Sequence, residues 1–306
     1  MNQTKCITVS IPGSTSNLGS GFDTLGVAIS LRNRLTLSFS DRKDGPVAHI
    51  TSHIPESVRA DAEGMLSNAC QVFEKKTGTE SRLIDVHIEG DVPVARGLGS
   101  SVTLRLGTIA GLSYLHGLEL AAPTIGEWVA EIEGHPDNAI PSAIGGFCAA
   151  GIDSDGKLNF AKFELPEDYT FITLIPDFEV KTDEARMSLP NSYSRENTVR
   201  GINRSTMVSA LLATAQPDKL QGFFDDPIHQ PFREKLIPGF NACMQAGRKA
   251  GAHAGWISGS GSTLMWLATK NVERIGEAIH KVMPNAGLHF LKSDNSGLKI
   301  LEQNRH

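Results

Sequence analysis

The chain has 306 residues, 40% of them apolar, which is enough to bury one large core or two ordinary ones. Its 29 basic and 34 acidic residues give a net charge of about −5, which argues against nucleic-acid or anionic-membrane partners and favours small-molecule chemistry. Four widely spaced cysteines, no signal pattern and no run of 18 apolar residues lead us to expect reduced thiols and a cytoplasmic protein.

The first half of the chain mixes strand and helix patterns. Apolar residues alternate strictly at 7–11 and 84–88, which predicts half-buried strands. Apolar residues at helical spacing predict a helix within 62–76 and a long buried one over 98–115 that ends near Gly117. Strands and helices are therefore mixed in this half.

A further helix is predicted over 123–133. Thr124 is a candidate cap, forming a capping box with Glu127, and Gly134 is a candidate stop. Its apolar residues form an inward stripe at Ile125, Trp128, Val129 and Ile132.

A glycine-rich, acidic stretch follows, so we place a domain boundary between residues 150 and 165. Beyond it, strands and helices occur in mixed order, which predicts an α+β class rather than strict βαβ alternation. The expected strands lie within 171–176, 255–268 and 288–292, and the expected helices within 204–215, 240–252 and 271–283.

The segment "GLGSS", Gly97 to Ser101, ends where the long helix begins. Unpaired backbone N–H groups and the positive end of the helix dipole make such a turn an anion site, with phosphate as the natural ligand. Ser100 and Ser101 can bond a phosphate oxygen or Mg²⁺, although the segment also suits an ordinary strand-to-helix turn. Walker A, dinucleotide-binding and nucleophile-elbow patterns are missing from the sequence.

A group of carboxylates surrounds the end of the 123–133 helix. Mg²⁺ needs one or two such oxygen ligands, and a general base would also be a carboxylate. The alternative is structural: Glu127 completes a capping box, Glu131 and Glu133 are solvated, and "GHPDN" is a helix end followed by a turn.

Two further features suggest a polar cleft. Asn17 and Asp23 stand in a glycine-rich segment after the first strand, and Arg186 and Arg233 are isolated arginines whose planar fork suits a carboxylate. Three glycines inside the apolar run 255–266 indicate either a close backbone approach or a bulge.

Taken in order, these segments resemble the GHMP kinase family and, within it, the homoserine kinase branch. The matching motifs cover residues from about 7 to 267 and are specific as a set: "PGSTSNLGSGFDTLGVA", "GLGSS", "EGHPDN" with "GGF", "TDEARMSLP", "HQPFREKLIPGF" and "ISGSGSTL".

The resemblance implies an α+β fold of two domains: residues 1–160, like domain 2 of ribosomal protein S5, and residues 161–306, ferredoxin-like. It implies transfer of the γ-phosphate of ATP, with Mg²⁺, to the hydroxyl of L-homoserine, giving O-phospho-L-homoserine for threonine biosynthesis. The family is commonly dimeric, so a homodimer is compatible with it, and neither nucleic acid nor membrane is an expected partner.

The resemblance also implies roles for single residues. ATP would lie on the loop Gly97, Leu98, Gly99, Ser100 and Ser101, with Pro93 and Arg96 beside it. Metal would be held by Ser101 and by Glu127, which we prefer to Glu133 because it lies ten residues before Asp137. Substrate contacts and catalysis would come from Asn17, Asp23, Asp137, Asn138, Thr182, Arg186 and Arg233, with Asp137 as a base in only some relatives.

The sequence departs from the family pattern at three positions: Thr103 and Arg105 replace alanine-rich positions after the loop, and Ser262 replaces a usual proline. Arg105 can approach a phosphate or meet the carboxylates of a neighbouring helix. Two other functions stay open: a GHMP kinase for another small alcohol, and a non-catalytic nucleotide-binding protein. An amino-acid substrate explains Asp23 together with two arginines better than another alcohol does. Loss of Ser101, Glu127 or Asn138 would indicate the non-catalytic protein, and all three are present.

Overall fold

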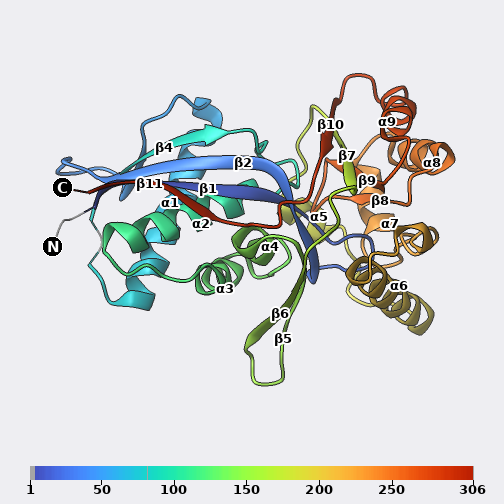
Figure 1. Cartoon of the computed structure of the whole chain (residues 1–306), viewed down its shortest axis with the longest axis horizontal. Helices are drawn as coiled ribbons and strands as arrows, with labels where there is room; N and C mark the ends of the chain where they lie inside the picture. Colours follow the sequence, from blue (N-terminus) through green and yellow to red (C-terminus); the bar gives the residue numbers. More distant parts are fainter. Residues whose placement is uncertain (1–3, 81, 306) are drawn as a thin grey trace.

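The computed structural model describes residues 4–80 and 82–305, which form two sheets and the helices that cover them (Figure 1). The larger sheet has the strand order β11-β1-β2-β4-β3, with β5 paired to β2 and β6 paired to β5. Its strands are β1 (Thr4–Ser16), β2 (Leu25–Phe39), β3 (Ala48–Ile50), β4 (Ile84–Gly90), β5 (Phe147–Ile152), β6 (Leu158–Phe163) and β11 (Lys299–Arg305).

The smaller sheet is antiparallel, with the order β10-β7-β9-β8. Its strands are β7 (Thr170–Ile175), β8 (Ala254–Ile257), β9 (Leu264–Ala268) and β10 (Gly287–Leu291). If its four strands are numbered 1 to 4 along the chain, their order in the sheet is 4-1-3-2, and helices follow the first and third strands. This is the ferredoxin-like arrangement. The predicted α+β class and the ferredoxin-like second half are confirmed.

The helices fall into two groups, one beside each sheet (Figure 1). The first group is α1 (Glu56–Thr77), α2 (Ser100–Leu115), α3 (Ala122–Glu133) and α4 (Ala139–Ile144). The second is α5 (Thr182–Met187), α6 (Arg195–Ala213), η1 (Pro217–Lys219), α7 (Gln230–Arg233), η2 (Glu234–Leu236), α8 (Phe240–Ala250) and α9 (Val272–His280). No described helix has both the length and the apolar character needed to span a membrane.

The alternating apolar residues of β1 explain the first core. Ile7, Val9 and Ile11 are fully buried and belong to the same cluster as residues of β2 and α2. Helix α2 lies between the sheet and its neighbouring helices, so it is buried almost all round and its apolar residues show no single face. A second core joins the halves, in which Trp256 packs edge-on against Phe171 and belongs to one cluster with Phe147. Burial of large aromatic rings holds the two sheets together.

The start of α3 differs from the prediction, whereas its end agrees with it. The helix begins at Ala122 with Pro123 in its first turn, and no side chain in the described chain caps it. Thr124 is therefore not the cap and the predicted capping box with Glu127 is wrong, because proline at the first turn lets the helix start earlier. Gly134 ends the helix in a left-handed conformation, as predicted.

The last strand crosses back to the first half. The two sheets separate after β6 at Phe163, close to the predicted boundary, but β11 pairs antiparallel with β1 in the larger sheet. A division into 1–160 and 161–306 therefore assigns this strand to the wrong sheet. Pairing with β1 covers an edge that would otherwise carry unpaired backbone groups.

Candidate functional site

A cavity of about 670 Å³ lies between the two halves of the molecule. Its walls come from the β1–β2 loop, the segment before α2, the end of α3, the start of α5, α7, and the loop after β8. A volume of this size falls in the range of small-molecule binding sites. Each end of the cavity has its own chemistry.

One end of the cavity is formed by the start of α2. Gly99, in a left-handed conformation, precedes the helix, and among the described residues no side chain caps its first turn. The first N–H groups of a helix have no partner within the helix, and its dipole adds positive charge there. Ser100 and Ser101 line the cavity beside them. This end is built to bind an anion such as phosphate.

The loop before α2 is fixed by contacts with the second half of the molecule. Ser258 donates a 2.6 Å hydrogen bond from its hydroxyl to the carbonyl oxygen of Gly97. Gly97 has a φ of 73°, and a Cβ atom there would lie 2.1 Å from the Ser258 carbonyl oxygen. Only glycine fits this position, because any side chain would meet backbone.

The other end of the cavity carries an ion pair between the two halves. Arg186 of α5 donates two hydrogen bonds, of 2.8 and 3.0 Å, to the two carboxylate oxygens of Asp23. The backbone N–H of Asp23 donates to the side-chain oxygen of Asn17 at 3.1 Å, and Asn17 donates to the carbonyl of Gly259. Both charged side chains keep about a third of their surface exposed, at 33% and 36%, so a ligand can reach them.

A second arginine stands at the same end. Arg233 is buried and donates a 2.9 Å hydrogen bond to the carbonyl of Gly259. Burial, and then the charge of Arg186, lower the pKa of its guanidinium to about 10. The ring of Phe22 lies 5.1 Å from the Arg233 guanidinium carbon and 5.5 Å from that of Arg186. Two guanidinium groups close to one aromatic ring can together bind a carboxylate.

Asp137 lies at this end too, paired with a histidine. Its carboxylate is buried and lies 2.5 Å from Nδ1 of His135. Burial of His135 opposes its charged form, but the Asp137 carboxylate prevails and raises the pKa of the imidazole. Each of Asp23, His135 and Asp137 has one side-chain oxygen or nitrogen atom that lies within 4.8 Å of the corresponding atoms of the other two. A polar group entering here meets two carboxylates and an imidazole.

The acidic residue that reaches the cavity from α3 is Glu133, at the end of the helix, and not Glu127. Six residues of helix separate them by about 9 Å along the axis and turn them to different faces. Glu127, the glutamate that we predicted as a metal ligand, is not among the described residues that line the cavity. Glu133 forms an ion pair with Arg105 of α2, the second of the two contacts that we considered for this arginine.

Most predicted site residues meet around this cavity, and two others do not. Asn138 lines it but is also held by β1, since its side chain bonds to Ser14 and Ser16. Pro93 and Leu98 are not among the described residues that line it. The predicted residues that do line it are Asn17, Asp23, Arg96, Gly97, Gly99, Ser100, Ser101, Asp137, Asn138, Thr182, Arg186 and Arg233.

Sequence reasoning missed three residues of the site: Phe22, Glu133 and His135. Glu133 and His135 were visible as members of the carboxylate group, and the position of Glu133 just before the helix stop Gly134 was the signal that could have selected it. Nothing in the sequence signalled Phe22, because its role depends on two arginines from distant segments.

Comparisons with known proteins agree with this geometry. Residues 64–146 match the family described as the GHMP kinases N terminal domain, and residues 207–285 match the GHMP kinases C terminal. The first match includes the phosphate-type loop and Glu133, and the second includes Arg233.

Relatives that match over nearly the full length of the chain include homoserine kinases. The chain is 38% identical over 299 residues to a homoserine kinase of Aquifex aeolicus, covering 96% of this chain and 99% of that protein. It is 32% identical to a homoserine kinase of Microchaete diplosiphon, covering 99% and 100%. The crystal structure of homoserine kinase from Cytophaga hutchinsonii superposes with a TM-score of 0.83 at 27% identity, covering 97% of this chain and 98% of that one.

Proposed function

The chain belongs to the homoserine kinase branch of the GHMP kinase family, and from this premise we propose that it transfers the γ-phosphate of ATP to the hydroxyl of L-homoserine. The product, O-phospho-L-homoserine, would serve threonine biosynthesis. Within this proposal the two ends of the cavity have separate tasks: the start of α2 binds the triphosphate and the charged end binds the amino acid.

The observation that carries the substrate assignment is the ion pair of Asp23 with Arg186. A zwitterion can replace this pair by two new ones, its ammonium group on Asp23 and its carboxylate on Arg186 and Arg233. A substrate with a carboxylate alone would leave Asp23 without a counter-ion, and a neutral sugar would satisfy neither charge. Because unpaired, partly buried charges are costly, the site selects an amino acid.

The nucleotide assignment rests on the backbone before α2. The free N–H groups of the first turn and the hydroxyl groups of Ser100 and Ser101 would bind the phosphate oxygens. In phosphoryl transfer the protein mainly positions the groups and neutralises charge. Arg96, held by the carbonyl of Pro176 at 3.1 Å, lies at the same wall of the cavity.

Mg²⁺ fits the donor set of this chain. Ser101 and Glu133 line the same cavity and offer a hydroxyl and a carboxylate oxygen, the hard ligands that Mg²⁺ prefers. When bound, the ion supplies charge neutralisation for the phosphate groups. Arg105 holds the Glu133 carboxylate in place beside the start of α2.

Asp137 is the carboxylate that would accept the proton of the substrate hydroxyl. Its carboxylate is buried, lies within 4.8 Å of the Asp23 carboxylate, and is oriented by its hydrogen bond with His135. An oriented carboxylate that contacts the attacking hydroxyl can serve as a general base. Thr182, at the first position of α5, stands at the rim of the same end.

The experiment that tests this function is ADP release from Mg·ATP with L-homoserine, L-serine, L-threonine, mevalonate, shikimate and galactose. We expect the highest kcat/KM for L-homoserine, because it carries an ammonium group, a carboxylate and a hydroxyl that can extend from them toward the γ-phosphate. 4-Hydroxybutyrate, which lacks only the ammonium group, is the matched control and should lose most of this rate. A higher kcat/KM for mevalonate or a sugar would overturn the substrate assignment.

A further inference from the structure

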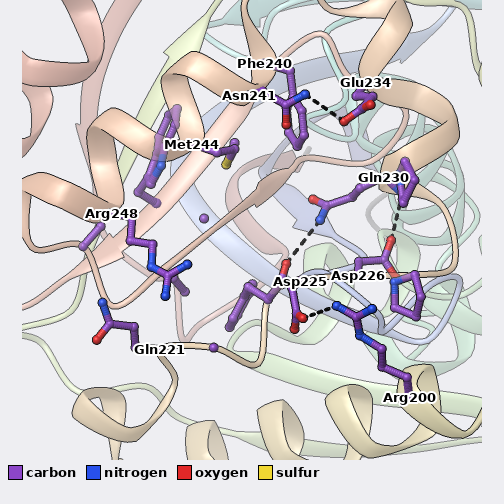
Figure 2. Close-up of a pocket in the computed structure, with 18 of the residues that line it drawn as sticks. Arg200, Gln221, Asp225, Asp226, Gln230, Glu234, Phe240, Asn241, Met244 and Arg248 are labelled. Carbon is purple, nitrogen blue, oxygen red and sulfur yellow. Dashed lines mark hydrogen bonds and ion pairs between the residues drawn. The ribbon is translucent and has the colours of Figure 1, made fainter. Parts of the chain in front are cut away.

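A second cavity, of about 540 Å³, lies wholly in the second half of the molecule (Figure 2). It is bounded by α6, α7, α8 and the loop 221–227, with β8 and β9 behind. Its volume falls in the range of small-molecule sites. Neither the nucleotide nor the amino acid of the proposed reaction has a use for it.

The acidic groups around this cavity already have partners. Asp225 pairs with Arg200 and with Arg204, and Asp226 accepts hydrogen bonds from three successive backbone N–H groups. Glu234 accepts from the side chain of Asn241 at 3.1 Å. Each of these acids therefore has hydrogen-bond partners, and Asp225 also has two arginines.

Arg248 is the exception. Among the described residues its side chain has neither a hydrogen-bond nor an ion-pair partner, and Figure 2 shows it directed from α8 into the same space as Gln221 and Asp225. Arg248, which is exposed on α8, is therefore the arginine of the cavity lining that has no carboxylate partner among the described residues. Its planar fork is suited to bidentate pairing with a carboxylate.

The floor of the cavity is apolar. Phe224, Phe240, Met244 and Trp266 line it. The indole Nε1–H of Trp266 is fully buried, because Gly247 and Gly255 pack directly against it. Trp266 therefore contributes its apolar ring to the floor, not its N–H.

We propose that this cavity is a second binding site, for a small organic carboxylate with an apolar body. The carboxylate pairs with Arg248, and the apolar body packs on Phe224, Phe240, Met244 and Trp266. An arginine without a carboxylate partner beside an apolar floor suits this class of ligand.

A ligand in the second cavity would contact α7, the helical turn that carries Arg233. Gln230 and Arg233 occupy the same single turn, α7, with Gln230 lining the second cavity and Arg233 lining the first. The side-chain oxygen of Gln230 accepts from the backbone N–H of Ile257 at 2.8 Å, which ties α7 to β8. Because α7 is shared, occupation of the second cavity shifts Arg233 and changes the KM for the amino acid; this consequence rests on the proposed function.

The test uses the full-length protein and phenylacetate as the probe, with phenylacetamide as its neutral counterpart. The chain has three tryptophans, so the indole N–H region of a ¹H–¹⁵N spectrum contains three signals, and Trp266→Phe identifies one of them. We expect phenylacetate to shift the Trp266 signal saturably and phenylacetamide to bind about tenfold more weakly, because it lacks the charge that pairs with Arg248.

Arg248→Gln should weaken phenylacetate binding about tenfold and leave phenylacetamide unchanged. Lys249→Gln is the matched control, since Lys249 is the exposed neighbour on α8 that does not line the cavity, and it should bind phenylacetate like the wild type. Equal weakening in both variants, or no shift of the Trp266 signal, would overturn the proposal. So would a shift confined to Trp256, whose N–H donates to Thr15 near the first cavity.

The kinetic consequence is measured separately. Phenylacetate should change the KM for L-homoserine in the wild type and in Lys249→Gln, but not in Arg248→Gln. If no kinase activity is found, the spectra still decide whether the second site exists. If activity is found and phenylacetate competes with L-homoserine equally in all three proteins, it binds in the first cavity and the proposal fails.

Discussion

The two ends of the first cavity are built in opposite ways. The anion-binding end comes from one short segment, Gly97 to Ser101, and uses mainly backbone groups at the start of α2. The amino-acid end is assembled from side chains of four distant segments, carrying Asp23, Asp137, Arg186 and Arg233. Backbone donors serve any phosphate, whereas paired charges distinguish one substrate from another. Reaction class and substrate choice therefore depend on different parts of the chain.

The largest effect is expected at the end of the cavity that is built from side chains of four segments. Arg186→Met removes two charge-assisted hydrogen bonds and leaves Asp23 unpaired, so kcat/KM for L-homoserine should fall about a thousandfold while the KM for ATP changes little. Steady-state kinetics with each substrate varied in turn measure this. Arg274→Met, an exposed arginine on α9, is the control. A similar loss for both substrates would contradict the separation of the two ends.

The second-largest effect is expected at the anion-binding end of the cavity, which is built mainly from backbone groups. Gly97→Ala should lower kcat/KM for ATP about a hundredfold, because its Cβ meets the carbonyl of Ser258 and displaces the loop. Gly117→Ala has nearly the same positive φ, 71°, but nothing within 4 Å of its Cβ. This control should lose only about 1–2 kcal/mol of unfolding free energy and keep its kinetics. Unchanged ATP kinetics in Gly97→Ala would remove the loop from the nucleotide site.

A smaller effect decides between the two glutamates. Glu133→Gln should raise the Mg²⁺ concentration needed for half-maximal rate about tenfold, whereas Glu127→Gln should leave it unchanged. Rates measured over a Mg²⁺ titration at fixed ATP give both values. The reverse result would restore the assignment to Glu127 that we made from the spacing to Asp137.

The smallest effect is on stability. Since Asp137 raises the pKa of His135 in the folded protein, this pair stabilises the fold below the unfolded pKa and loses its contribution as pH rises through the folded pKa. His135→Asn should therefore cost on the order of 1 kcal/mol in urea unfolding at pH 5.5 and less at pH 8.5. His87→Asn, in an exposed pair with Glu89, should show no such trend. A cost that grows with pH would mean that the imidazole is held neutral.

Patterns along the chain were sufficient where the structure is local. Residues 97–101 are adjacent in sequence and their conformation follows from glycine and a helix start, so the glycine turn before α2 could be predicted from these five residues. Gly134 was recognised as a helix stop for the same reason. Thr124 failed as a cap because Pro123 allowed an earlier start.

The direction of α3 places Glu133, and not Glu127, on the cavity wall, and this direction cannot be read from the helical periodicity of the sequence. The pairing of Arg105 with Glu133, and the return of β11 to the first sheet, likewise depend on how helices and strands pack. The second cavity arises only because α6, α7 and α8 enclose one space.

By itself, the sequence determined the α+β class, the phosphate-type loop and the kinds of residue available for an amino-acid substrate. Only the tertiary structure decided which of those residues meet: Asp23 reaches Arg186 across 163 positions of the chain, and Arg105 is turned to Glu133. The physical reason is the separation along the chain between the residues that interact. Turns and caps depend on neighbouring residues, whereas an ion pair between distant segments exists only after both sheets and their shared core have formed.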